Sequence, residues 1–188
     1  MSYFEKNGQT ITGFVLGASM AAIVLAASAA PLTPQASTAT AQIINLKGQP
    51  IGSATLTEVP QGVKIRVDAS GLPAGQQLAF HIHEKGVCDA GDGFKTAGGH
   101  FNPTGKEHGM NSPHGAHAGD MMNVTVAKDG TLHTEVINTA VTLNIGANSI
   151  MDVDGSALVL HAKADDYTSQ PAGNAGDRIA CGVIKQGS

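Results

Sequence analysis

Val63-Lys-Ile-Arg-Val-Asp68 alternates apolar and polar side chains with a period of two residues. That alternation is typical of a β-strand that buries one face and exposes the other. On either side of it, short segments of the same character are separated by turn residues such as Lys128-Asp-Gly130. We expect strands at 42–46, 53–59, 63–68, 77–83, 123–127, 132–137, 157–161 and 179–184. This spacing predicts an all-β fold, either an antiparallel sandwich or a flattened barrel.

The composition agrees with one β-rich domain behind an N-terminal extension. The chain has 188 residues, of which 24 are glycine and 4% are aromatic. Segments 84–122 and 162–178 lack strand patterning, and long loops in a compact domain are usually functional or disordered. Because the two segments hold His, Asp and Arg, we interpret them as functional loops. The net charge of −4, with no basic stripe, argues against a nucleic-acid partner.

The N-terminus predicts export from the cytoplasm. Ile11 to Ala30 is almost wholly apolar, and Ala27-Ser-Ala29 provides the small residues of a cleavage site. About 20 apolar residues can also span a bilayer, so an uncleaved membrane anchor is the alternative. We therefore expect a signal peptide or anchor at 1–30, a flexible tether at 31–40 and a periplasmic or otherwise exported domain at 41–188. In such a compartment Cys88 and Cys181 can pair, the alternative being two buried free thiols.

One stretch, from His81 to Asp120, contains six of the eight histidines. Imidazole nitrogens and a carboxylate suit zinc and copper better than magnesium or calcium, which prefer oxygen ligands. His81 and His83 point to the same side of one strand because side chains alternate along it. With His161 there are enough ligands for two metals. His100 could serve both through its two ring nitrogens, although spacing alone does not establish this bridge.

Several motifs together resemble the copper/zinc superoxide dismutases, in register from about residue 41 to residue 185. They are His81-Ile-His83-Glu84, Gly99-His100-Phe101-Asn102-Pro103, His117-Ala-Gly-Asp120, His161-Ala-Lys-Ala-Asp165-Asp166 and Gly173-Asn-Ala-Gly-Asp-Arg178-Ile-Ala-Cys181-Gly182. The resemblance implies a Greek-key β-barrel of eight antiparallel strands with two long functional loops. It also implies the activity, which converts superoxide to dioxygen and hydrogen peroxide by cycling copper between Cu(II) and Cu(I), with zinc in a structural role.

The resemblance assigns a role to each motif residue. The implied copper ligands are His81, His83, His100 and His161. The implied zinc ligands are His100, His108, His117 and Asp120, with His100 as the bridge. Asp165 would hydrogen-bond one histidine of each metal, and Cys88 would pair with Cys181. Arg178 would orient the superoxide anion and His100 would carry a proton to the peroxide.

This sequence departs from the animal members of the family in its last loop, which is short and has no lysine between Asp165 and Arg178. Lys85 and Lys95, on the loop of Cys88, could supply the steering charge instead. The family includes monomers and homodimers. The alternative function is a non-enzymatic copper- or zinc-binding protein on the same fold that buffers or delivers metal. The enzyme is favoured because such a protein needs neither Arg178 nor a fourth copper ligand.

Other polar residues near these motifs receive more ordinary interpretations. We expect His133 on the surface, and we expect Glu84, Asp166 and Asp177 to be solvated or to serve local turns. His114 could compete for zinc, although the family pattern uses His117 with Asp120. The methionines Met110, Met121 and Met122 are expected to fill gaps under a loop rather than to capture copper.

Overall fold

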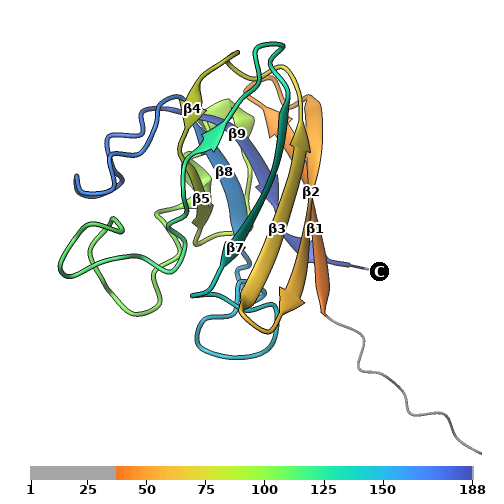
Figure 1. The fold of residues 1–188 in the computed structure, drawn as a ribbon. Helices are drawn as coiled ribbons and strands as arrows, with labels where there is room; N and C mark the ends of the chain where they lie inside the picture. The colour runs from red at the N-terminus through yellow and green to blue at the C-terminus, as the bar shows by residue number, and fades with distance from the viewer. Residues whose placement is uncertain (1–36, 188) are drawn as a thin grey trace, which may run out of the picture. The chain divides into compact units, whose positions relative to one another are not determined.

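One curled antiparallel sheet dominates the computed structural model, which describes residues 37–187 (Figure 1). Its strand order is β5-β8-β9-β1-β2-β3-β7, and β10 also pairs with β1. The bounds are β1 Thr38–Asn45, β2 Pro50–Val59, β3 Gly62–Ala69, β5 Phe80–His83, β7 Leu132–Asn138, β8 Ala157–His161, β9 Arg178–Val183 and β10 Lys185–Gln186. A small second sheet pairs β4 (Gln77–Leu78) with β6 (Val124–Thr125).

The predicted all-β antiparallel class is confirmed. Several neighbours in the sheet are distant in sequence, since β5 pairs with β8, β9 with β1 and β3 with β7, as Greek-key connections require. The only helices in the described part are two short 3₁₀ turns, η1 (Ala90–Asp92) and η2 (Lys95–Ala97). No helix between residues 37 and 187 has the length and apolar character needed to cross a bilayer.

The period of two in β3 builds the core. Val63, Ile65 and Val67 are fully buried, whereas Arg66 between them is exposed. Burying each such side chain contributes roughly 1.5–3 kcal/mol. Leu56 of β2 and other inward residues complete one continuous apolar cluster between the two sides of the curled sheet. The barrel wall is therefore a rigid support for whatever its loops carry.

Several strand boundaries differ from the sequence-based expectation; β2, for example, begins at Pro50 rather than at 53, and β6 covers only Val124–Thr125 of the expected 123–127. The segment expected at 77–83 divides at Ala79, whose N–H donates to the Lys163 carbonyl (2.8 Å) and whose carbonyl accepts from His161 N (3.0 Å). The strand thereby changes partner from β6 to β8. β1 begins at Thr38, so it takes up the last residues of the segment expected to be a tether. The expected signal or anchor at 1–30 lies outside the described residues.

The two long loops meet on the outer side of β5 and β8 (Figure 1). Hydrogen bonds join them directly: Asn111 N donates to the Tyr167 carbonyl (3.1 Å) and His108 N donates to Gln170 Oε1 (2.9 Å). Residues more than fifty positions apart are thus held in one layer over the barrel wall, where most of the histidines lie.

Candidate metal centre

Four histidines from three elements converge beside the barrel wall. His81 and His83 come from β5, whose four residues are all buried because the loops cover its outer face. His161 ends β8 at a register shift, which turns its side chain toward β5, and strand bulges often re-aim side chains in this way. His100 pairs with His83 through an isolated antiparallel bridge. One ligand atom from each of the four lies within 4.8 Å of the others.

Hydrogen bonds leave one free nitrogen on each of these rings. The Gly98 carbonyl accepts from His83 Nδ1 (3.0 Å) and the Gly176 carbonyl accepts from His161 Nδ1 (3.3 Å), so each Nε2 is unprotonated. These two Nε2 atoms face each other at 3.4 Å. His81 Nδ1 and His100 Nε2 are buried without any hydrogen-bond partner. Buried polar atoms are normally paired, so these two nitrogens, together with the facing Nε2 atoms of His83 and His161, fit a copper ion held by imidazoles alone.

A second cluster consists of His100, His108, His117 and Asp120, again with ligand atoms within 4.8 Å of one another. Asp120 Oδ1 lies 2.8 Å from His100 Nδ1, 3.0 Å from His108 Nδ1 and 3.5 Å from His117 Nδ1. Four ligands about 2.0–2.1 Å from a zinc ion would stand about 3.4 Å apart on the edges of a tetrahedron. The three-nitrogen, one-oxygen set therefore fits zinc in both chemistry and spacing.

His100 belongs to both clusters. Its Nδ1 faces Asp120 and also His117 Nδ1 (3.3 Å), while the opposite ring atom, Nε2, lies with the first cluster. The two clusters are therefore adjacent and share one ring, an arrangement that spacing in the sequence left open.

Asp165 hydrogen-bonds one histidine of each cluster. This buried carboxylate accepts from His81 Nε2 (2.9 Å) and from His108 Nε2 (3.0 Å). Because an ionised carboxylate only accepts, both Nε2 atoms carry hydrogens and both Nδ1 atoms are left to face a metal. Asn123 holds Asp165 in turn, since its side chain bonds both the N–H (2.8 Å) and the carbonyl (2.9 Å) of that residue.

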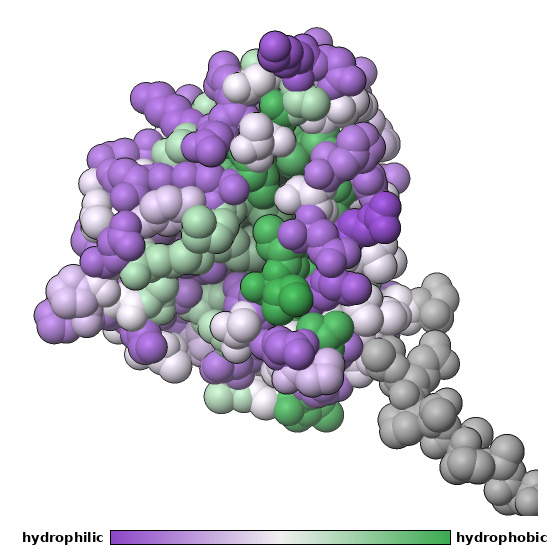
Figure 2. Space-filling model, in the orientation of Figure 1, coloured by the Kyte–Doolittle hydropathy of each residue, from purple (hydrophilic) through white to green (hydrophobic). Residues whose placement is uncertain are grey.

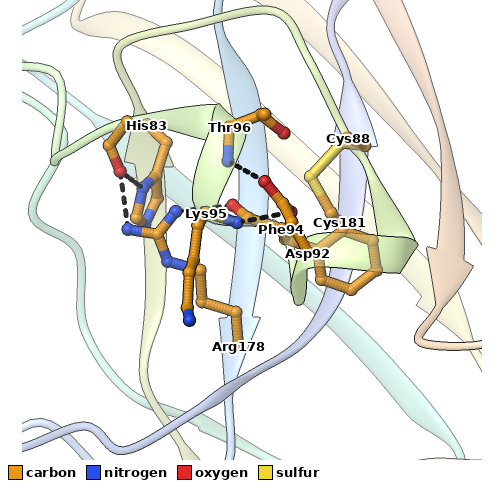
Figure 3. Close-up of a disulfide and its surroundings, with 9 residues drawn as sticks. His83, Cys88, Asp92, Phe94, Lys95, Thr96, Arg178 and Cys181 are labelled. Atoms are coloured by element: carbon orange, nitrogen blue, oxygen red, sulfur yellow. Dashed lines mark hydrogen bonds between the residues drawn. A yellow bond between two sulfur atoms is a disulfide. The ribbon is translucent and has the colours of Figure 1, made fainter.

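Arg178 lies beside the first cluster (Figure 3) because the β8–β9 register places it opposite His161. Its Nη1 donates to the Phe94 carbonyl and its Nη2 to the Gly98 carbonyl, each at 2.6 Å. The guanidinium lines a cleft of about 520 Å³ together with Lys95. Asp92 and Asp177 line the same cleft, so its charge is mixed, but a cation fixed on its wall by two carbonyls is suited to binding a small anion.

The disulfide between Cys88 and Cys181 is present, as expected, with the Cα atoms 5.7 Å apart (Figure 3). It ties the loop that carries Phe94 and Gly98 to β9, the strand that begins with Arg178. The disulfide therefore gives a covalent connection between the strand of Arg178 and the loop whose carbonyls hold its guanidinium.

Sequence and structure comparisons point to a single family. Residues 51–184 match copper/zinc superoxide dismutase (SODC). Superoxide dismutase (Cu-Zn) 1 of Aquifex aeolicus is 53% identical over 146 residues, which are 77% of this chain and 86% of the relative. The chain belongs to the copper/zinc superoxide dismutase family.

Solved structures of family members agree with this placement. The crystal structure of a SOD-like protein from Bacillus subtilis is 41% identical, covers 78% of this chain and 97% of its own, and aligns with a TM-score of 0.75. The copper/zinc superoxide dismutase of Brucella abortus is 25% identical, with coverage of 79% and 99% and a TM-score of 0.65. The copper and zinc of the family agree with the donor sets of the two clusters.

Burial and hydrogen bonds to carboxylates act in opposite directions on the pKa values of the histidines in the two clusters. Burial lowers the pKa of His100 to about 4 and that of His161 to about 3, so both rings are neutral and free to bind metal. At His108 burial also acts to lower the pKa, but hydrogen bonds to Asp120 and Asp165 outweigh it and raise the pKa to about 9. Without metal, His108 is thus a cation between two carboxylates.

The other polar residues singled out in the sequence, two lysines, two histidines and Glu84, lie outside the two clusters. Lys95 lines the cleft, whereas Lys85 is exposed and does not line it. His114 is exposed, and His133 is a surface residue that contacts Asp68 (2.7 Å). Glu84 is exposed as expected, but it is not merely solvated, because Oε1 accepts from Gly99 N (3.0 Å). That interaction depends on a contact fifteen residues away, which no local sequence signal indicates.

The methionines divide between core and surface. Met121 is buried, in agreement with a gap-filling role. Met110 and Met122 are exposed and, with Ile137 of β7, line an apolar hollow of about 560 Å³ between the loop and β7 (Figure 2). His117, whose side chain is the most exposed of the four in the second cluster, also lines this hollow.

Proposed function

We propose that this chain is an exported superoxide dismutase whose copper is held by the first cluster and whose zinc is held by the second. The enzyme converts superoxide to dioxygen and hydrogen peroxide. The observation that carries the residue assignment is the pair of adjoining clusters sharing His100, with Arg178 opposite His161 and lining a cleft.

Bound copper supplies the Cu(II)/Cu(I) couple that oxidises one superoxide and reduces another, while zinc, which has no redox chemistry, supplies charge and structure. The protein provides the rest. The Arg178 guanidinium binds each arriving anion, and its two carbonyl contacts keep it aimed into the cleft. His100 Nε2, which has no protein hydrogen-bond partner, would bind copper and, when not bound to it, would hold one proton for the departing peroxide, the second proton coming from water.

The alternative function, metal buffering or delivery on the same fold, is not favoured. A metal-buffering protein does not require a guanidinium fixed by two carbonyls beside one cluster. It would also tolerate the loss of one histidine. Here the four-imidazole set and the arginine are both present.

The test is metal analysis together with superoxide turnover of wild type and Arg178→Ala. We expect one copper and one zinc per chain in both proteins. The kcat/KM of the variant should fall by roughly 10- to 150-fold, the equivalent of a charge-assisted contact of about 1.5–3 kcal/mol. Arg178→Lys should recover part of the loss. Zinc alone in the wild type, with no turnover after copper loading, would support the metal-buffering function instead.

Lys95 is proposed to steer superoxide toward the cleft that it lines. We expect Lys95→Glu to lower kcat/KM about two- to tenfold at low ionic strength and to weaken the fall of activity with added salt. Lys128→Glu makes the same charge change at an exposed turn and serves as the matched control. Equal salt profiles for the two variants would show that Lys95 has no special role.

The disulfide fits an oxidising compartment outside the cytoplasm. We propose that residues 1–30 direct export as a signal peptide or anchor, and that the part of the expected tether that precedes β1 at Thr38 links them to the dismutase domain. N-terminal sequencing of protein recovered from the periplasm distinguishes cleavage from anchoring. Recovery from the cytoplasm with free thiols would refute the proposal.

A further inference from the structure

The Gly98 carbonyl is a shared acceptor for two functional side chains. It accepts from His83 Nδ1 (3.0 Å) and from Arg178 Nη2 (2.6 Å). Any rotation of this carbonyl would move both an implied copper ligand and the guanidinium. Its orientation therefore matters to the site, although Gly98 itself has no side chain to fix it.

Glu84 holds the other end of the same peptide unit. Its carboxylate Oε1 accepts from Gly99 N (3.0 Å), and its own N–H donates to the Gly99 carbonyl (3.0 Å). In a planar trans peptide the C=O of one residue and the N–H of the next point in opposite directions. Holding the Gly99 N–H therefore aims the Gly98 carbonyl at His83 and Arg178.

The glycine at position 98 makes room for this clamp. Its φ is +76°, and a Cβ added there would lie 2.5 Å from Glu84 Oε1 and 2.7 Å from Glu84 Cγ. The Glu84 side chain thus lies directly against the backbone that it positions, a proximity that a larger residue at 98 would prevent.

The second carbonyl that holds Arg178 is fixed in the same way (Figure 3). Phe94 O accepts from Arg178 Nη1, and the N–H of the same peptide unit, Lys95 N, donates to Asp92 Oδ1 (2.9 Å). Asp92 Oδ2 also accepts from Thr96 N (2.9 Å). Each arm of the guanidinium is therefore joined through one rigid peptide plane to one carboxylate.

We propose that Glu84 and Asp92 are positioning residues that orient Arg178 by holding the N–H groups of the two peptide units whose carbonyls bind it. The proposal rests on the role of Arg178 given above. The proposal predicts the direction in which kcat/KM changes, because a carboxylate near the path of an anion repels that anion. If these residues acted only through charge, removing one would raise kcat/KM, whereas loss of positioning lowers it.

The first test compares Glu84→Ala, Glu84→Gln and Asp92→Ala. We expect kcat/KM to fall about three- to tenfold in both alanine variants, the size of a modest charge-assisted hydrogen bond at an exposed site. Glu84→Gln, whose amide oxygen still accepts from Gly99 N, should retain most of the activity. Glu135→Ala removes an exposed carboxylate from β7 and is the matched charge control, with activity unchanged. A rise in kcat/KM for Glu84→Ala would overturn the proposal.

A double-mutant cycle separates action through Arg178 from any other effect. Asp92→Ala should cost nothing further in an Arg178→Ala background, because the Phe94 carbonyl that Asp92 positions binds Arg178 and no histidine of the clusters. Glu84 is left out of this cycle because the Gly98 carbonyl also accepts from His83 Nδ1. Additive losses would refute positioning. If Arg178→Ala alone left activity unchanged, the proposed function of Arg178 would fail; if only Arg178→Ala lowered activity, the positioning inference alone would fail.

The last readout does not depend on turnover. In zinc-loaded, copper-free protein, NMR of the arginine side chains should show slow guanidinium rotation for Arg178 in wild type and Glu84→Gln. Rotation should be faster in Glu84→Ala and in Asp92→Ala, with circular dichroism confirming that all variants are folded. Identical rotation rates in all four proteins would overturn the proposal.

Discussion

At the scale of single residues, hydrogen bonds decide which ring nitrogen faces the metal clusters in four histidines, His81, His83, His108 and His161. Carbonyls and one carboxylate occupy the nitrogens that point away, and the opposite nitrogens are left for metal. Asp165 is central because it acts on one histidine of each cluster. A buried carboxylate between two rings gives this site its geometry before any ion arrives.

Asp165→Asn should weaken the retention of both metals. The amide offers only one oxygen, so its NH₂ group must face His81 Nε2 or His108 Nε2, both of which carry hydrogens. We expect affinities for copper and zinc about 10- to 100-fold lower in chelator competition. Asp166→Asn is the control, since Asp166 is exposed and accepts from Ser169 N in its own loop. Unchanged affinity for both metals in Asp165→Asn would contradict this view of the residue.

At the scale of elements, register and one covalent link assemble the site. The β8–β9 register sets His161 opposite Arg178, and the disulfide joins the loop of Cys88 to β9 at Cys181, 93 residues away. Cys181 lies in a small apolar cluster with Phe94 and Val159. The link therefore holds both the arginine strand and the loop whose carbonyls bind the arginine.

Replacing both cysteines by serine should destabilise the metal-free protein. Closing a loop of this length restricts the unfolded chain, and loop-closure entropy gives about 4.5 kcal/mol as an upper figure. Urea denaturation of wild type and the double variant measures the difference in the free energy of unfolding. At temperatures where the double variant is still folded, its turnover should also be lower than that of wild type. Equal unfolding midpoints for the two proteins would show that the link does not stabilise the fold.

At the scale of the whole molecule, a barrel wall and a loop layer depend on different forces. The wall is a continuous apolar core with paired strands. The loop layer is held by polar contacts around the two clusters and by inter-loop hydrogen bonds such as His108 N to Gln170 Oε1. Metals bind the folded state only, so their stabilisation acts mainly on the layer that carries their ligands.

Metal removal should therefore loosen the loops and spare the wall. In hydrogen–deuterium exchange, amides at 100–122 and 164–177 should exchange faster after chelation, whereas β1, β2 and β3 should remain protected. The melting temperature should fall and return when copper and zinc are restored. Uniform loss of protection across the molecule would mean that the barrel itself needs the metals.

The sequence predicted much of this site because its motifs are local. His81 and His83 share a strand face by alternation alone, and the resemblance supplied the partners from other segments. Glu84 and Asp92 could not be assigned in this way. Their carboxylates accept hydrogen bonds from backbone N–H groups of a loop, and no sequence motif marks which N–H groups those are.

Strand positions, the antiparallel all-β class and the donor types suited to copper and zinc follow from the sequence itself, because period-two patterning and ligand chemistry are properties of short segments. The shared His100 ring, the pairing of His161 with Arg178 and the division of the strand at Ala79 were decided only by the tertiary structure. These features depend on register and on contacts between segments far apart in the chain, where position is set by packing of the whole barrel.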